Sequence, residues 1–364
     1  MQEYGGISRY FAGIAKEMQG IANVEARVIA PLHINAYLDR LPRELVYGRK
    51  VTNYRALSLG RRLAGAVVCD ILQRRFDPDV VHKTYYHALP GVPSRAANVI
   101  TVYDMIQEKF PHDFPPGNLM SKLKRRAVMK ADHVICISEQ TRLDLLSLYR
   151  IPAERVSVTL LGYDSLAEQL GAETEAEFRS RAIGCESPYL LYVGRRQHGY
   201  KNFDGLLRAY QASRWLRATF QVVCFGGGPF REDELARLKD MGILERVRYV
   251  GGGDRTLASC YRHAALFVFP SFYEGFGIPP LEAMSVDCPV ACSNTSSIPE
   301  VVGDAGAYLD PSDIESIRET LERVLGSTSE RAELVRRGRI RRREFSWRKC
   351  ALETVSVYRG ITTV

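Results

Sequence analysis

The chain has 364 residues, of which 46% are hydrophobic and 25% charged, and its formal net charge is +8. This length is sufficient for two domains with separate cores, and the composition is that of a globular protein. No apolar run reaches the roughly 18 residues of a membrane span, and no signal-peptide pattern opens the chain, so we expect a cytoplasmic protein. The eight cysteines lack paired Cys-x-x-Cys spacing. Cys136 and Cys224 lie in apolar runs, which indicates reduced core residues.

The excess positive charge is concentrated in two runs, residues 122–126 and 336–343. A solvated helix face is the simplest interpretation of each run, and attraction to an anionic lipid surface is the main alternative. No nucleic-acid-binding motif accompanies them, so we expect no nucleic-acid partner.

The first half of the chain alternates strand-like and helix-like patterns. Gly5 and Gly6 precede an amphipathic helix, and a glycine pair at this place lets the backbone approach a ligand or begins a helix after a loop. Further along come a strand pattern at 24–30, a helix pattern at 58–75, and strand patterns at 80–82 and 98–103. Such alternation predicts a parallel sheet with crossover helices.

Polar residues follow or precede these predicted strands. Tyr103 and Asp104 end the strand at 98–103, where Asp104 is either a substrate group or a cap of the next segment. Asp77-Pro-Asp79 precedes a strand, which indicates a turn and no metal site. Ser138 follows the strand pattern after Ala131 and is expected to cap the next helix.

The pattern weakens over residues 166–187, which we interpret as a linker. A new strand at 189–194 then leads through a basic loop into a helix at 203–212. A strand, basic loop and helix offer amides and cations to a diphosphate, although two exposed basic residues on a loop would give the same pattern. Arg195 and Lys201 are the candidates, whereas Arg196 and His198 are expected to be loop residues without a role.

Two glycine runs follow later strands. Gly226–Pro229 begins a turn after an apolar strand but lacks the G-x-G-x-x-G spacing of a dinucleotide site, so it marks the fold more than a ligand. Residues 251–253 follow the strand at 247–250.

The most informative stretch is residues 264–284. An apolar strand ends before Pro270. The glycines at 275 and 277 then allow a tight loop, and a helix begins near Pro279. Glu274 in the loop and Glu282 in the helix would lie at the carboxyl end of the strand, where ligands bind in α/β sheets. Amides at the helix start attract phosphate and carboxylates accept hydrogen bonds from hydroxyls, so this stretch favours a nucleotide sugar.

The spacing of Glu274 and Glu282 resembles the E-x7-E signature of retaining, two-domain glycosyltransferases of family 4, and the resemblance continues through 288–300 and 303–306. It implies an α/β fold of the GT-B type, in which two doubly wound Rossmann-like domains face a cleft. The implied domains are an N-terminal acceptor-side domain at 1–165, the linker at 166–187, a C-terminal nucleotide-sugar domain at 188–345, and a final helix at 346–364 that crosses back to the first domain.

The resemblance also implies roles for individual residues. Arg195 and Lys201 would stabilise the departing diphosphate, Glu274 would orient the donor sugar, and Glu282 would bind the ribose. Gly277 would lie beside the donor, and the backbone of Gly5 and Gly6 would close over the diphosphate. Asp104 and Tyr103 would lie near the reacting sugar. No metal and no cofactor are implied.

The chain departs from the family pattern at four places. One is the triple glycine at 251–253, which lies where family members contact the base of the nucleotide. Tyr103 stands where family members usually carry histidine, and Asp287 stands where glycine is usual. The strand that normally precedes the Gly5-Gly6 loop is missing, and we expect a truncated or misassigned start.

By this resemblance we expect a hexosyltransferase, GDP-mannose favoured as donor, that acts on a glycan or a polyprenyl-diphosphate-linked acceptor in cell-surface polysaccharide synthesis. The basic runs add an anionic membrane surface as a partner and a peripheral position on the inner face of the cell membrane. The alternatives are a transferase using a UDP- or dTDP-sugar, a GT-B epimerase, a phosphorylase, or a non-catalytic accessory protein. A phosphorylase would need a lysine-bound pyridoxal phosphate, for which the sequence has no marker.

Overall fold

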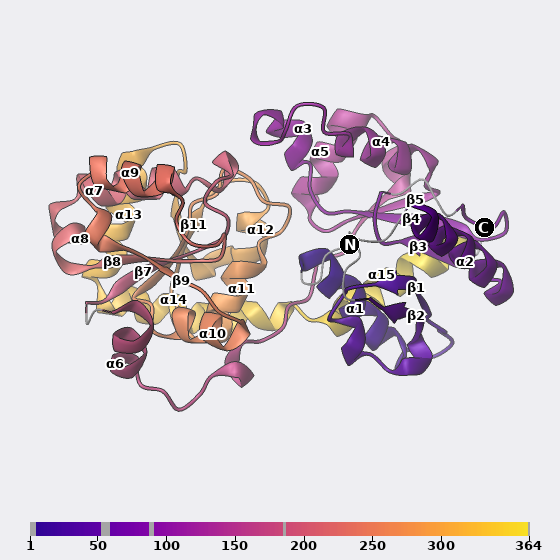
Figure 1. Cartoon of the computed structure of the whole chain (residues 1–364), viewed down its shortest axis with the longest axis horizontal. Helices are drawn as coiled ribbons and strands as arrows, with labels where there is room; N and C mark the ends of the chain where they lie inside the picture. The colour runs from indigo at the N-terminus through magenta and orange to yellow at the C-terminus, as the bar shows by residue number, and fades with distance from the viewer. Residues whose placement is uncertain (1–4, 52–58, 87–90, 185–186, 363–364) are drawn as a thin grey trace. The chain divides into compact units, whose positions relative to one another are not determined.

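The structure is a computed structural model that describes residues 5–51, 59–86, 91–184 and 187–362. It divides into two compact units, residues 1–162 with 345–364 and residues 163–344. Figure 1 shows each unit as strands covered by helices.

The described part of the first unit contains two parallel sheets. The smaller sheet pairs β1 with β2, and the larger has the order β3-β4-β5-β6. Among the described residues no strand joins β1 to β3, so each is an edge strand of its own sheet. The elements are α1 (Gly6–Met18), β1 (Val28–His33), β2 (Val46–Lys50), α2 (Leu59–Phe76), β3 (Val80–Lys83), β4 (Ala97–Val102), α3 (Ile106–Lys109), α4 (Met120–Lys130), β5 (His133–Cys136), α5 (Glu139–Tyr149), β6 (Val156–Val158) and α15 (Trp347–Thr362).

The C-terminal helix α15 packs in the first unit, alongside α1 (Figure 1). Arg348 donates hydrogen bonds to the carbonyls of Glu17 and Gly20 at the end of α1, and a Cβ at Gly13 would lie 2.6 Å from the Trp347 ring. The two helices therefore lie so close together that a side chain larger than that of glycine at position 13 would clash with Trp347.

A partly buried chain of polar side chains connects α15 to the larger sheet. His82 of β3 lies 2.8 Å from the Thr101 hydroxyl through Nε2 and 2.5 Å from the Tyr358 hydroxyl through Nδ1. Desolvation lowers the pKa of His82 to about 3, so this imidazole is neutral at physiological pH.

The second unit has one parallel sheet of six strands in the order β12-β11-β10-β7-β8-β9. Helices α7 and α13 pack on one face, and α10, α11 and α14 on the other (Figure 1). The elements are α6 (Glu175–Phe178), β7 (Tyr189–Val193), α7 (Phe203–Ala212), α8 (Arg214–Thr219), β8 (Gln221–Phe225), α9 (Glu232–Asp240), β9 (Val247–Val250), α10 (Asp254–Arg262), β10 (Leu266–Phe269), α11 (Ile278–Ser285), β11 (Val290–Ser293), α12 (Ile298–Val302), β12 (Gly306–Leu309), α13 (Ile314–Gly326) and α14 (Thr328–Arg341).

The sequence-based boundaries differ from the two units mainly at the expected linker. The described residues of 166–187 belong to the second unit, where Phe178 and Ile183 are buried. Thr174 and Glu177 form a capping box that begins α6. A glutamate- and alanine-rich stretch thus folds as packed helix because two apolar side chains in it reach the core.

Smaller expectations can be compared directly with the structure. Ser138 caps α5 by accepting a hydrogen bond from the Thr141 amide. The strand expected at 24–30 lies at Val28–His33 because a turn occupies residues 21–24. Asp287 has a φ of 63°, and its carboxylate pairs with Arg339 and Arg262. The pair with Arg339 lowers the pKa of Asp287.

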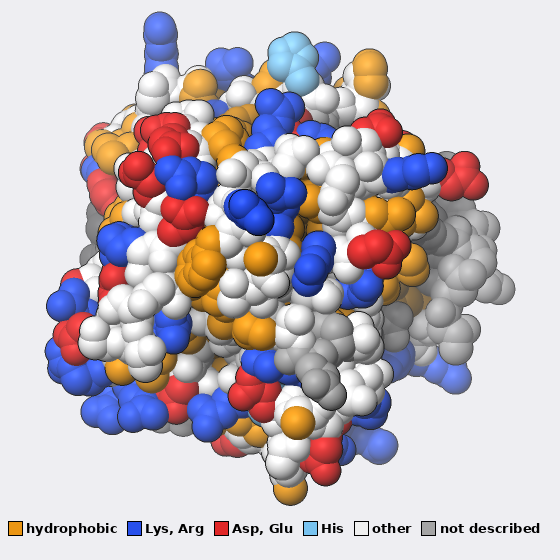
Figure 2. Space-filling view, turned by 90° about the vertical axis from the view of Figure 1, so that its left-hand side faces the viewer, with side chains coloured by type: hydrophobic (Ala, Val, Ile, Leu, Met, Phe, Trp, Pro, Cys, Tyr) orange, Lys and Arg blue, Asp and Glu red, His pale blue; other side chains and the backbone are white. Residues whose placement is uncertain are grey.

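The basic residues of the second unit are mostly engaged in ion pairs. Arg336 and Arg337 of α14 both pair with Glu333, and Arg339 pairs with Asp287. Figure 2 shows one face of the molecule, on which basic side chains are interspersed with acidic ones. Within α14, the arginines of the positive run at 336–341 are therefore all paired with carboxylates.

Candidate functional site

The strand order of the second unit locates its ligand-binding edge. Strand β7 is flanked by β8 and β10, so the chain runs outward from β7 in one direction and from β10 in the other. In open α/β sheets, ligands bind at the carboxyl ends of the strands where this reversal occurs. The loops that leave β7 and β10 at that point are residues 194–202 and 270–277. They contain four of the predicted residues, Arg195, Lys201, Glu274 and Gly277.

The loop after β7 presents Arg195 to solvent. Among the residues that the structure describes, none forms a hydrogen bond or ion pair with its guanidinium. Asn202 ends the loop with a φ of 51° and caps α7 by accepting a hydrogen bond from the Gly205 amide. Its amide nitrogen donates to the Pro270 carbonyl at 3.0 Å, so Asn202 fixes this loop to the one after β10.

Lys201 and Glu274 form the ion pair that joins the two loops. The Lys201 Nζ lies 2.7 Å from Glu274 Oε1, and the side chains are 18% and 11% exposed. The Phe272 amide donates to the Tyr200 carbonyl at 2.8 Å and adds a backbone link. An ammonium has three donor hydrogens, so this single hydrogen bond leaves Lys201 with donors for an anion.

Two serines from the segment after β11 hold the Glu274 loop. Ser296 accepts from the Glu274 amide at 2.9 Å, and Ser297 donates to the carbonyls of Glu274 and Phe276 at 2.8 and 2.9 Å. Sequence reasoning did not assign them a role, although a run of hydroxyl residues directly after a buried strand is a recognisable signal. They fix the direction in which the Glu274 carboxylate leaves the backbone.

The next helix carries the second glutamate of the pair. Gly277 has a φ of 110°, which favours glycine, and it is the residue from which α11 begins. Glu282 lies about one turn into α11 and is 6% exposed. Burial, and after it the charge of Glu282, raises the pKa of Tyr261 on α10 well above its ordinary value.

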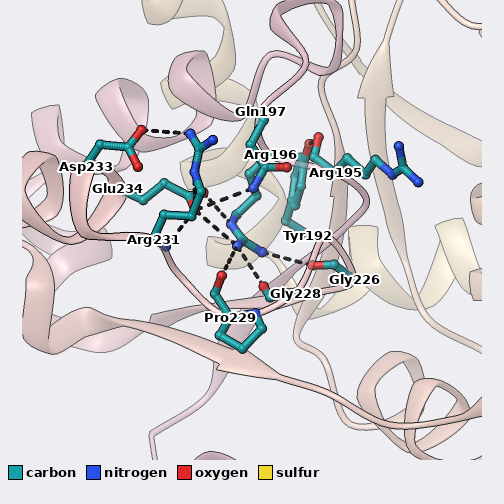
Figure 3. Close-up of polar contacts among 10 residues, drawn as sticks. All are labelled: Tyr192, Arg195, Arg196, Gln197, Gly226, Gly228, Pro229, Arg231, Asp233 and Glu234. Atoms are coloured by element: carbon teal, nitrogen blue, oxygen red, sulfur yellow. Dashed lines mark hydrogen bonds and ion pairs between the residues drawn. The ribbon is translucent and has the colours of Figure 1, made fainter.

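Arg196 is the residue that sequence reasoning misjudged, because its side chain is fully buried. It donates hydrogen bonds to the carbonyls of Gly226, Gly228 and Pro229 at 2.9, 2.8 and 3.2 Å, and its Nε lies 2.8 Å from Glu234 Oε1 (Figure 3). Burial alone would raise the pKa of Glu234, but the hydrogen bonds from Arg196 and from the Arg231 amide hold that pKa below its ordinary value. Arg196 thus holds a glycine-rich turn from inside the protein.

The turn that Arg196 holds lies against the backbone of the β7 loop. Gly226, Gly227 and Gly228 have φ values of 86°, 74° and 81°, a conformation that side chains disfavour. A Cβ at Gly227 would lie 3.3 Å from the Cα of Arg195 and from the carbonyl oxygen of Gly194. Figure 3 shows the Arg195 side chain leaving this point in the opposite direction from Arg196.

The first unit contains the remaining predicted residues. Asp104 accepts a hydrogen bond from the Ile106 amide at the start of α3, while its side chain remains 33% exposed. The Tyr103 hydroxyl donates to the Thr84 carbonyl at 3.1 Å, and burial raises its pKa. The Tyr103 hydroxyl proton is therefore engaged in a hydrogen bond within the protein.

A buried lysine lies behind Asp104. Lys124 of α4 has a side chain that is 3% exposed and donates hydrogen bonds to the Asp104 carbonyl at 2.9 Å and to Glu108 at 2.8 Å. Tyr149 donates to the other oxygen of Glu108 at 2.7 Å. This cluster fixes the backbone on which Asp104 stands.

Gly5 and Gly6 begin α1 as expected, with Gly5 in an extended conformation before the helix. Among the described residues, none lies within 4 Å of a Cβ built at Gly6. None of them therefore requires glycine at position 6.

Comparisons with known proteins agree with this geometry. The family of glycosyl transferases group 1 matches residues 173–341, and glycosyltransferase family 4 matches residues 4–165. The chain is 30% identical to O-antigen chain mannosyltransferase B of Escherichia coli over 97% of this chain and 96% of that protein. It is 23% identical to O-antigen chain mannosyltransferase RfbU of Salmonella typhimurium over 88% and 87% of the two chains.

Solved structures of GT-B enzymes have the same fold. WaaG, a glycosyltransferase involved in lipopolysaccharide biosynthesis, aligns with a TM-score of 0.72 at 18% identity, over 98% of this chain and 97% of that chain. Anabaena HepE in complex with UDP and glucose aligns with a TM-score of 0.72 at 17% identity, over 98% and 97%. The predicted GT-B class is therefore confirmed. The chain belongs to glycosyltransferase family 4, in group 1, and is a glycosyltransferase.

Proposed function

We propose that the protein transfers a hexose, with GDP-mannose as the favoured donor, from a nucleotide diphosphate sugar to a glycan or polyprenyl-diphosphate-linked acceptor, with retention of the anomeric configuration. The observation that carries the proposal is the Lys201–Glu274 pair, with Arg195 in the same loop as Lys201, at the point where the second unit's strand order reverses. The 30% identity to an O-antigen chain mannosyltransferase supports mannose and cell-surface polysaccharide.

The proposed chemistry uses charge that is already in place. As the bond between the sugar carbon and the diphosphate oxygen breaks, negative charge grows on the diphosphate, and Arg195 and Lys201 stabilise it. The acceptor hydroxyl attacks the same carbon and loses its proton to the departing phosphate. Glu274 accepts hydrogen bonds from donor sugar hydroxyls, and Glu282 accepts them from the ribose. Asp104 and Tyr103 belong to the acceptor side of this proposal.

Two cations at the diphosphate would supply the charge that a metal ion supplies in other transferases, so we propose that no metal is required. Turnover should then be unchanged by saturating EDTA. If EDTA abolished turnover and manganese or magnesium restored it, the proposed metal independence would be wrong. The assignment of the donor would not be affected.

A donor panel tests the function. The purified protein is incubated with GDP-mannose, UDP-glucose, UDP-galactose and dTDP-rhamnose in separate reactions, each with a synthetic polyprenyl-diphosphate glycan. We expect transfer from GDP-mannose alone, with an anomeric NMR coupling that shows retention. Transfer from a UDP- or dTDP-sugar would move the assignment to that donor, and conversion of the free sugar nucleotide without transfer would favour an epimerase. No turnover with any donor would favour an accessory protein.

An anionic membrane is the second proposed partner, and α4 is the surface that would meet it. Lys122, Arg125 and Arg126 are exposed on this helix, next to the exposed side chain of Met129. Each cation near anionic lipid contributes about 1 kcal/mol. No helix in the described residues is long and apolar enough to cross a membrane.

Flotation with liposomes tests this partner. Binding to phosphatidylglycerol-containing but not phosphatidylcholine liposomes is expected, and it should weaken with salt. Replacing Lys122, Arg125 and Arg126 with serine should abolish it, whereas the same change at Arg336, Arg337 and Arg339, whose charges are paired on α14, should not. Equal binding to both liposomes would contradict the proposal.

A further inference from the structure

Arg195 and Arg196 are neighbours of the same residue type in opposite environments. Arg195 is exposed, and its guanidinium has no partner among the described residues, whereas the Arg196 side chain is completely buried. A buried guanidinium is costly unless its donors and its charge are matched. The contacts of Arg196 meet both conditions.

All three nitrogens of the Arg196 guanidinium are occupied within the protein. They donate to three carbonyls of the turn at 226–229 and to both oxygens of Glu234. The Phe230 ring lies 4.5 Å from the guanidinium carbon. Because its side chain is completely buried and its charge is paired with Glu234, Arg196 cannot reach a ligand, and any role in transfer must be indirect.

The route from Arg196 to Arg195 runs through the glycine turn. A Cβ built at Gly227 would lie only 3.3 Å from the Arg195 Cα, so the turn passes close to the Arg195 backbone, and displacing the turn would change the packing on that side. The other side is held by the Gly194 amide, which donates to the Phe225 carbonyl at 2.9 Å, and by the Tyr192 hydroxyl, which donates to the Arg195 carbonyl at 3.4 Å. The direction of the Arg195 side chain thus depends on a turn whose carbonyls Arg196 holds.

We propose that Arg196 is a positioning residue that sets Arg195 to receive the diphosphate of the donor. The proposal rests on the proposed function, because it assigns Arg195 to a diphosphate. It predicts that loss of Arg196 weakens binding of a nucleoside diphosphate and leaves binding of the uncharged nucleoside nearly unchanged. A cation that is already fixed before the ligand arrives loses less conformational entropy on binding than a mobile one.

Calorimetry with GDP and guanosine, and in parallel UDP and uridine, tests this prediction. Arg196→Lys keeps the charge beside Glu234 but cannot hold three carbonyls in the geometry of a guanidinium. We expect it to weaken binding of the diphosphate by about tenfold or more and of the nucleoside by less than about threefold. Arg231→Ala is the matched control, since the Arg231 side chain pairs with Asp233 and Glu234 and forms no hydrogen bond with the turn carbonyls within the described part of the chain. It should change neither affinity.

A second pair of variants tests the turn without changing Arg196. Gly227→Ala and Gly228→Ala introduce similar backbone strain at similar φ. Only the first places a Cβ against Arg195, because a Cβ at Gly228 meets no described residue within 4 Å. The loss of diphosphate affinity should therefore be larger for Gly227→Ala. This comparison carries the test if Arg196→Lys does not fold.

The outcomes separate the two proposals. Unchanged diphosphate affinity in folded Arg196→Lys, or equal losses for Gly227→Ala and Gly228→Ala, would overturn the positioning role and leave the proposed function intact. Equal losses of diphosphate and nucleoside would show general damage and would also overturn it. Failure of the wild-type protein to bind any nucleoside diphosphate would instead contradict the proposed function itself.

Discussion

Each unit places a lysine beside carboxylates near the end of a parallel strand, yet the two lysines differ in what remains available to a ligand. Lys124 in the first unit is 3% exposed and donates to both a backbone carbonyl and Glu108. Lys201 in the second unit is 18% exposed, makes one hydrogen bond to Glu274, and lies in a loop with the exposed Arg195. The same residue types therefore form a structural cluster in one unit and a candidate ligand site in the other.

The largest expected effect is on the buried lysine. Lys124→Met should lower the free energy of unfolding by about 3–5 kcal/mol, because Glu108 would stay buried without its cation. Urea denaturation measures the change. The exposed Lys122→Met should alter stability by less than about 0.5 kcal/mol. A loss below about 1 kcal/mol for Lys124→Met would mean that the first-unit cluster is not structural.

The second expected effect separates the two glutamates of the candidate site. Glu282→Gln keeps the shape of the side chain but removes the charged acceptor, so it should weaken nucleotide binding by about 1.5–3 kcal/mol. Glu274→Gln should lower turnover more than nucleotide affinity, since its proposed partner is the sugar. Calorimetry with the bare nucleotide alongside steady-state kinetics measures both. The opposite pattern would reverse the two roles.

A third prediction concerns the cations of the second unit. Arg195→Ala and Lys201→Ala should each lower turnover by about tenfold or more, which corresponds to about 1.4 kcal/mol or above in barrier, without lowering the free energy of unfolding. Kinetics and urea denaturation of the same preparations test this. Unchanged turnover in both variants would mean that Arg195 and Lys201 do not bind the diphosphate, and the two lysines would no longer differ in function.

The smallest expected effect is a pH dependence of stability from the first unit. His82 has a folded pKa of about 3 against an ordinary value of 6.5, so the unfolded chain takes up a proton as pH falls below 6.5 and the folded chain does not. Stability from this residue is fully present above pH 6.5 and is lost as pH falls towards 3. Between pH 7 and 5.5 the loss should be about 1 kcal/mol.

Urea denaturation of His82→Gln at both pH values measures this contribution. In His82→Gln, the loss of unfolding free energy between pH 7 and 5.5 should be smaller by about 1 kcal/mol, whereas the control His112→Gln, at an exposed position, should show the same loss as the wild type. An unchanged pH dependence in His82→Gln would contradict the account of the partly buried polar chain from β3 to α15.

The sequence predicted the second unit better than the first. The helix at 203–212 and the strand at 247–250 have the predicted bounds, because local periodicity and flanking turn residues define them. Strand β2 was missed, since it contains Gly48 and two basic residues and shows no alternation. A Cβ at Gly48 would lie 1.8 Å from the Ala30 carbonyl, so this strand depends on close approach to β1 and not on its own side chains.

The candidate site shows the same division. Glu274, Lys201 and Arg195 could be predicted because a family signature contains them, and the structure brings Lys201 and Glu274 together. Arg196 could not be distinguished from Arg195 by residue type, because its burial depends on carbonyls 30 to 33 positions away. Lys124 lies in a basic run that predicts an exposed helix face, and only the packing of Glu108 and Tyr149 shows that its charge is internal.

The central claim is that the reversal point of the second unit's sheet holds a nucleotide diphosphate. A crystal structure of the protein with GDP, and with UDP as a second ligand, tests it most directly. The account predicts density for the diphosphate within hydrogen-bonding distance of Arg195 and Lys201, with the ribose against Glu282. A nucleotide bound elsewhere, with the loops at 194–202 and 270–277 empty, would contradict it.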